Sequence, residues 1–90
     1  MSVEVQKTVK LAKVNATLLV YTGRLDSWKA EVATLEDDLL VLSEAGKVRL
    51  LEAKAGVAQS LKMVQRLERH RETLETTSNE DLVSLGYLEN

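Results

Sequence analysis

Cysteine and proline are absent from this chain of 90 residues. The absence of cysteine excludes disulfides, thiolate nucleophiles and cysteine-based zinc or iron–sulfur sites. The absence of proline removes the strongest helix breaker, and only four glycines are present. Aromatic residues are few as well, namely Tyr21, Trp28 and Tyr87. Because helix breakers and favoured strand formers are both scarce, the composition predicts an all-α chain.

Residues for catalysis and metal binding are also scarce. His70 is the only histidine, which excludes metal sites with two imidazoles. Neither a GxGxxG nor a GxxxxGK[ST] pattern occurs, so nucleotide binding has no support. The acidic run of residues 36–38, with Glu31 and Glu44 on either side, is predicted to be a solvated helix face. We therefore expect no enzyme activity, metal, cofactor or small-molecule substrate.

Charge and hydrophobic runs give little indication of a charged or lipid partner. The formal net charge is -2, which provides no overall attraction to nucleic acid or to an anionic membrane. The uninterrupted apolar run Leu18–Tyr21 is too short to span a bilayer. The expectation is a cytoplasmic protein that does not bind membranes.

The strongest pattern in the sequence is a heptad repeat in the first half of the chain. Alternate steps of three and four residues meet only apolar side chains, a spacing that keeps one side of a helix against a partner helix. We call these ten helix-packing positions the first seam: Leu11, Val14, Leu18, Tyr21, Leu25, Trp28, Val32, Leu35, Leu39 and Leu42. The repeat predicts one long helix from about residue 3 to 44.

A break in this helix is the main alternative. Residues Gly23–Ser27 could form a turn in which Asp26 or Ser27 caps a new helix, and the chain would then be a three-helix bundle. The heptad stays in phase through these residues, which favours the continuous helix.

The first seam ends where small and polar residues occupy 43–47, and Gly46 there suits a left-handed helix cap. We predict a turn at 43–47, a second helix at about 48–76 and a short one at about 79–85, capped by Ser78, in a single domain. A weaker heptad follows the turn. We call it the second seam: Leu50, Ala53, Val57, Ser60, Val64, Leu67, Arg71 and Leu74.

A short turn makes the two long helices antiparallel neighbours, in a coiled-coil-like hairpin. With the turn near residue 45, the numbers of facing residues should sum to about 92. The first helix also carries apolar residues beyond its seam. We call this set the apolar stripe: Val5, Val9, Ala12, Ala16 and Leu19. Either the C-terminal tail or another subunit could cover it, and we expect a homodimer that forms a four-helix bundle, or a tight hetero-complex.

These features favour a non-catalytic module for protein–protein interaction, such as an adaptor, an assembly chaperone or a regulator. Its mechanism would be the packing of amphipathic helices, with flanking charges that select the partner. The C-terminal segment either caps the bundle or docks on a partner. The candidate docking residues are Leu82, Val83, Leu85, Tyr87 and Leu88.

A nucleic-acid-associated accessory factor is the alternative function. The most basic part of the second helix consists of Lys62, Arg66, Arg69 and Arg71. Phosphate groups could bind along this face. Glutamates are interleaved with these bases, however, and no aromatic residue accompanies them for base stacking. Protein–protein interaction is therefore the favoured prediction.

Overall fold

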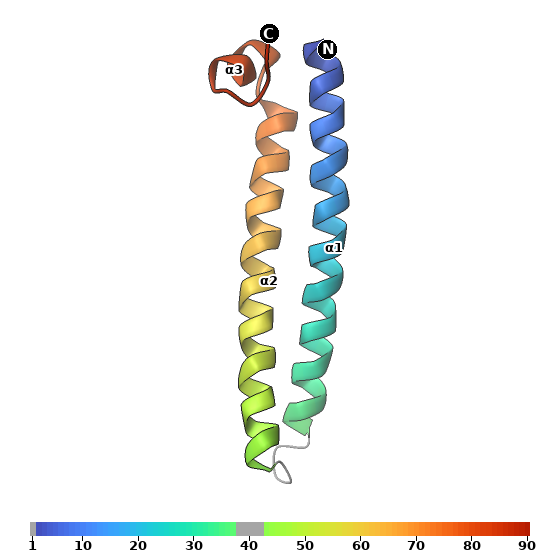
Figure 1. Ribbon diagram of the computed structural model, residues 1–90, viewed down its shortest axis with the longest axis vertical. Coiled ribbons are helices and arrows are strands. Elements are labelled where there is room, and N and C mark those ends of the chain that lie inside the picture. The colour runs from blue at the N-terminus through green and yellow to red at the C-terminus, as the bar shows by residue number, and fades with distance from the viewer. Residues whose placement is uncertain (1, 38–42) are drawn as a thin grey trace. The chain divides into compact units, whose positions relative to one another are not determined.

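The computed structural model describes residues 2–37 and 43–90 as three helices (Figure 1). These are α1 (Val3–Asp37), α2 (Glu44–Thr76) and α3 (Asn79–Ser84). The two long helices pack against each other as a helical hairpin, and the described residues contain no strand. The all-α prediction is confirmed.

Helix α1 is continuous through Gly23, so the predicted continuous helix is confirmed at this point and the alternative with a break at Gly23–Ser27 is wrong. Leu25, two residues after the glycine, is buried, so the heptad keeps its phase across Gly23. Gly23 itself is exposed, and a Cβ atom built on it would meet nothing within 4 Å. Its cost is limited to helix propensity, about 1 kcal/mol relative to alanine.

The predicted turn at 43–47 is wrong in its position. The Ser43 hydroxyl accepts a hydrogen bond from the Gly46 amide at 3.2 Å, and the Ser43 carbonyl accepts one from the Lys47 amide at 3.0 Å. Ser43 therefore caps α2, and Gly46 lies in its first turn rather than at the end of α1. Seam positions Leu39 and Leu42 lie outside the described residues.

This shift changes how the helices face each other. Trp28 lies against Gly56, and their residue numbers sum to 84. Arg71 donates a hydrogen bond to Asn15, and the numbers of these two residues sum to 86. Both values are below the predicted sum of about 92, because α2 starts earlier than we expected from the glycine.

The chain divides into two compact units, which we describe separately. Unit 1 consists of Met1–Leu19 and Gln65–Asn90, and unit 2 consists of Val20–Val64. In unit 1, Val14, Leu74, Leu82 and Leu88 form a buried cluster. The partly buried residues packed around this cluster are Val3, Leu11, Leu67, Val83 and Tyr87.

The interior of unit 2 is made by the two seams. Leu25 of α1 is buried there, as are Leu50, Ala53 and Val64 of α2. Ser60 is also buried, at a seam position where a larger apolar residue would be usual. The helix–helix contact in this unit therefore includes several small side chains.

Helix α3 has a well-defined start and end. The Ser78 hydroxyl accepts a hydrogen bond from the Asp81 amide at 3.2 Å and so caps the helix. After Leu85 the chain turns at Gly86, whose φ of +86° is a left-handed conformation that favours glycine. The amides of Tyr87 and Leu88 both donate to the Leu82 carbonyl, which folds the end of the chain back onto α3.

None of the helices in the described part of the chain is both long enough and apolar enough to cross a membrane.

Candidate interaction surface

The helix–helix contact involves the described positions of both seams. On α1 these are Leu11, Val14, Leu18, Tyr21, Leu25, Trp28, Val32 and Leu35, all buried or half-buried. The second seam shows the same pattern along its whole length, from Leu50 to Leu74. The seam side chains are thus largely occupied by packing within the chain. Any partner would have to use other surfaces.

Trp28 packs closely against the α2 backbone at Gly56 in unit 2. A Cβ atom on Gly56 would lie 2.5 Å from Cδ2 and 2.5 Å from Cε2 of the Trp28 indole, closer than real Cβ atoms come to other atoms. Only glycine leaves room for this ring against the α2 backbone. By helix propensity alone, Gly56 would only destabilise α2. The structure shows that it accommodates Trp28.

Two of the acidic residues of unit 2 form ion pairs across the hairpin. The Glu31 carboxylate lies 2.6 Å from Nε of Arg49, and the Glu36 carboxylate lies 3.4 Å from Nζ of Lys54. The acidic stretch therefore serves in part to bridge α1 and α2, where we predicted a solvated face. Among the described residues, no group of three or more His, Asp or Glu side chains could hold a metal ion.

The candidate docking residues of the C-terminal segment are divided between the interior and the surface. Leu82 and Leu88 are buried in the cluster of unit 1, whereas Leu85 is 66% exposed. Two hydrogen bonds also fix the segment, because the Gln6 side chain donates to the Glu89 carbonyl at 2.7 Å and accepts from its amide at 2.8 Å. In the structure this segment packs on its own chain.

His70, the single histidine, also contacts the C-terminal segment. Its ring centroid lies 5.5 Å from that of Tyr87, with the two rings tilted by 45°. Both residues are half-buried. This aromatic contact gives His70 a packing role in unit 1.

An open groove of about 480 Å³ lies beside α3 in unit 1. It is lined by Ser2, Val3, Glu4, Asn79, Glu80, Val83, Ser84 and Asn90. Asn79 Oδ1 is buried there and has no hydrogen-bond partner among the described residues. Serine hydroxyls and carboxylates are present in the lining, but the only imidazole of the chain contacts Tyr87. The groove therefore lacks the serine–histidine pairing used for acyl transfer.

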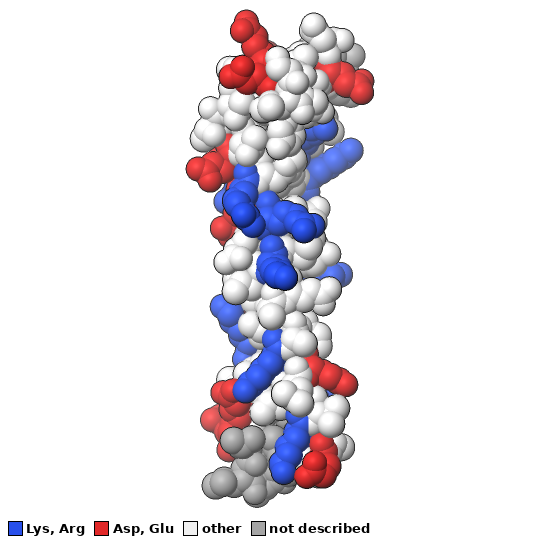
Figure 2. Space-filling model, turned by 90° about the vertical axis from the view of Figure 1, so that its left-hand side faces the viewer, with Lys and Arg blue, Asp and Glu red and all other residues white. Residues whose placement is uncertain are grey.

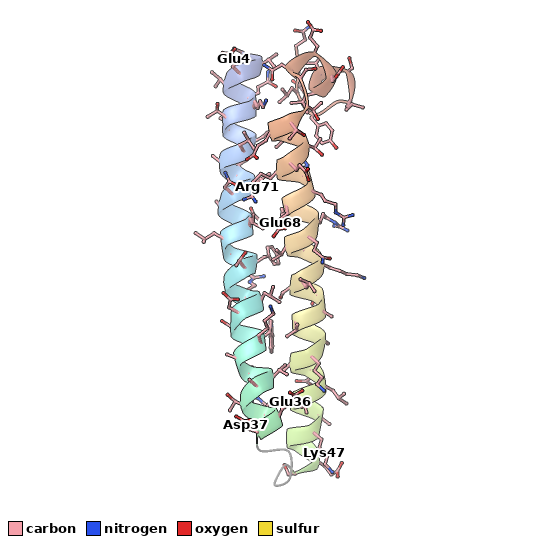
Figure 3. All side chains as sticks on the ribbon, turned by 180° about the vertical axis from the view of Figure 1, so that it is seen from behind. Glu4, Glu36, Asp37, Lys47, Glu68 and Arg71 are labelled. Atoms are coloured by element: carbon pink, nitrogen blue, oxygen red, sulfur yellow. The ribbon has the colours of Figure 1, made fainter. Side chains whose placement is uncertain are left out.

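The basic residues of α2 do not all point the same way. Lys62, Arg66 and Arg69 are exposed, and Figure 2 shows lysine and arginine side chains on the surface of α2. Arg71 is half-buried and donates to Asn15 Oδ1 at 3.5 Å, so its guanidinium is directed toward α1 (Figure 3). It is therefore turned away from the exposed basic side chains.

The apolar stripe is the main apolar surface of α1 in unit 1 that the hairpin leaves uncovered. All five of its residues are exposed, and Leu19 is 76% exposed. At about 100° per residue, Ala16 lies about 160° around the helix from the buried Leu18. The stripe thus faces away from α2. Sequence alone identified these residues, and the structure places them on the surface.

Comparisons of this chain with protein-family models, with curated proteins and with solved structures found no match.

Proposed function

We propose that this protein is a non-catalytic module for protein–protein interaction that binds a helix of its partner through the apolar stripe. The observation that carries the proposal is the exposure of Leu19, a large apolar side chain on a helix face that α2 does not cover. Val5 and Val9 lie on the same stripe and are also exposed. Contiguous apolar patches of this kind are typical of protein interaction sites.

The composition of the stripe supports a helix as the binding partner. Its residues recur at steps of four and three, the spacing with which one helix packs along another. Ala12 and Ala16 lie at its centre, and small side chains allow two helix axes to approach closely. The apolar side chains would supply affinity, and Lys13 at the edge of the stripe would contribute to partner choice.

The charge distribution supports a surface made for packing rather than for solvation. No charged residue occurs from Val14 to Gly23, although several of these positions are exposed. An exposed helix that only contacts water usually carries charges on that face. An adaptor, an assembly chaperone or a regulator in the cytoplasm would each fit this surface.

Site-specific photo-crosslinking tests the proposal. A photoreactive residue replaces Leu19 in cells that express the chain, and the control carries it at Leu51, which is 68% exposed on α2. We expect protein crosslinks from position 19 that Ala16→Lys abolishes, and few from position 51. Equal crosslinking at the two positions, or crosslinks to nucleic acid, would overturn the proposal.

A further inference from the structure

We infer that the partner of the apolar stripe is a second copy of this chain, bound with the two α1 helices antiparallel and face to face. This inference rests on the proposed function and names its partner. Three observations support it, namely the order of side chains along the stripe, the exposed area of the chain and the absence of charge on the stripe.

The order of side chains makes the stripe complementary to itself. In an antiparallel pair with residue numbers that sum to 28, each step of three on one helix meets a step of three on the other, and each step of four meets a step of four. Ala12 then faces Ala16 of the second copy, and Val9 faces Leu19. The small residues form the two central layers and the large ones close both ends, so the helices approach without a clash or a gap.

The exposed area is close to what such a dimer requires. The chain exposes 6502 Å², whereas a folded monomer of 10.0 kDa exposes about 5,200 Å². The excess of roughly 1,300 Å² exceeds the area of about 800 Å² that each partner contributes to a standard interface. A second copy would bring the exposed area of each chain toward the usual range.

The absence of charge on the stripe allows two copies of the same surface to meet. Because the pairing is two-fold symmetric, any charge on the stripe would face an identical or neighbouring charge of the second copy. The five stripe residues carry none. Lys13, next to the stripe, would lie at the rim.

Sedimentation equilibrium of the purified full chain over a wide concentration range is the first part of the test. We expect a dimer, and we expect Leu19→Lys to raise its dissociation constant by about tenfold or more, since each dimer buries Leu19 twice. Leu51→Lys is the matched control and should leave the dissociation constant unchanged. Both side chains are largely exposed in the single chain, so circular dichroism should show both variants folded.

Disulfide crosslinking tests the register of the two antiparallel α1 helices. The chain has no cysteine of its own, so only the introduced cysteines can crosslink. We expect a mixture of Ala12→Cys and Ala16→Cys chains to crosslink faster than either variant alone, because only the mixture brings the two sulfur atoms into one layer. Lys10→Cys, an exposed position away from the stripe, is the control.

The outcomes separate this inference from the proposed function. A monomer at every concentration, or a dimer that Leu19→Lys leaves intact, would overturn the second copy as the partner. If the purified chain is a monomer while position 19 still crosslinks to another protein in cells, the proposed function holds and this inference fails. Failure of both experiments would remove the stripe as a binding site.

Discussion

The indole of Trp28 and the backbone at Gly56 occupy neighbouring space so closely that a single methyl group at residue 56 would overlap the ring. Gly56→Ala gains up to about 1 kcal/mol of helix propensity but forces the ring to move. Overpacking of this kind costs about 1 to 3 kcal/mol, so we expect a net loss of about 0 to 2 kcal/mol in the free energy of unfolding. Urea denaturation followed by circular dichroism measures it.

Gly23→Ala is the control for this prediction. A Cβ atom at Gly23 meets nothing within 4 Å, so only the gain in helix propensity remains. We expect a stabilisation of about 0.5 to 1 kcal/mol. If Gly56→Ala stabilises the protein as much as Gly23→Ala, the Trp28 contact is wrong.

The two leucines Leu82 and Leu85 should differ sharply in their contribution to stability. Leu82 is 0% exposed in the unit 1 cluster, and replacing it by alanine leaves a cavity among Val14, Leu74 and Leu88. We expect Leu82→Ala to lower the free energy of unfolding by about 2 to 5 kcal/mol. Leu85→Ala should change it by no more than about 0.5 kcal/mol. Similar losses for both would show that the C-terminal segment packs differently.

The ion pair of Arg49 and Glu31 should contribute little despite its short distance. The Arg49 side chain is 69% exposed, and exposed pairs contribute about 0 to 1 kcal/mol. A double-mutant cycle with Arg49→Ala and Glu31→Ala should give a coupling in this range that decreases as salt is added. A coupling well above 1 kcal/mol would mean that the pair is far less hydrated than its exposure indicates.

Salt should strengthen the inferred dimer. In an antiparallel pair each edge of one helix faces the same edge of the other, which brings the two Lys13 side chains near each other. Screening reduces their repulsion, so the dissociation constant should fall by about twofold between 0.05 and 0.5 M salt. Lys13→Gln should tighten the dimer at low salt and remove most of this dependence. Binding of nucleic acid would show the opposite trend.

The sequence alone predicts the helical segments and the inward-facing residues well, because the heptad spacing constrains which side chains can face another helix. The described positions of the first seam, from Leu11 to Leu35, are all buried or half-buried, and Gly23 does not interrupt the helix. A periodic pattern over many residues outweighs one glycine, whose cost of about 1 kcal/mol is small beside the packing of several leucines.

The turn was harder to predict because two local signals compete there. Gly46 suits the end of a helix, but Ser43 suits the beginning of one, and the structure uses the serine. If the turn is misplaced by a few residues, the sum of the numbers of two facing residues changes by twice that many. This is why the sequence did not identify the contact of Trp28 with Gly56.

Of the surface sites, the sequence predicts the exposure of the apolar stripe but not the placement of the C-terminal leucines. Exposure of the apolar stripe follows from its spacing, since it lies on the face of α1 opposite Leu18. The placement of the C-terminal leucines does not follow from spacing, because it depends on the left-handed turn at Gly86 and on the hydrogen bonds of Gln6 with Glu89.

The division into two units gives the chain separate spectroscopic probes. The only tryptophan, Trp28, is in unit 2, while Tyr87 packs near His70 in unit 1. Selective excitation of the indole therefore reports on one unit, and the ring protons of His70 and Tyr87 report on the other by nuclear magnetic resonance. Coincident melting curves would mean that the hairpin unfolds as one cooperative structure, whereas separated curves would mean that one half can open while the other stays folded.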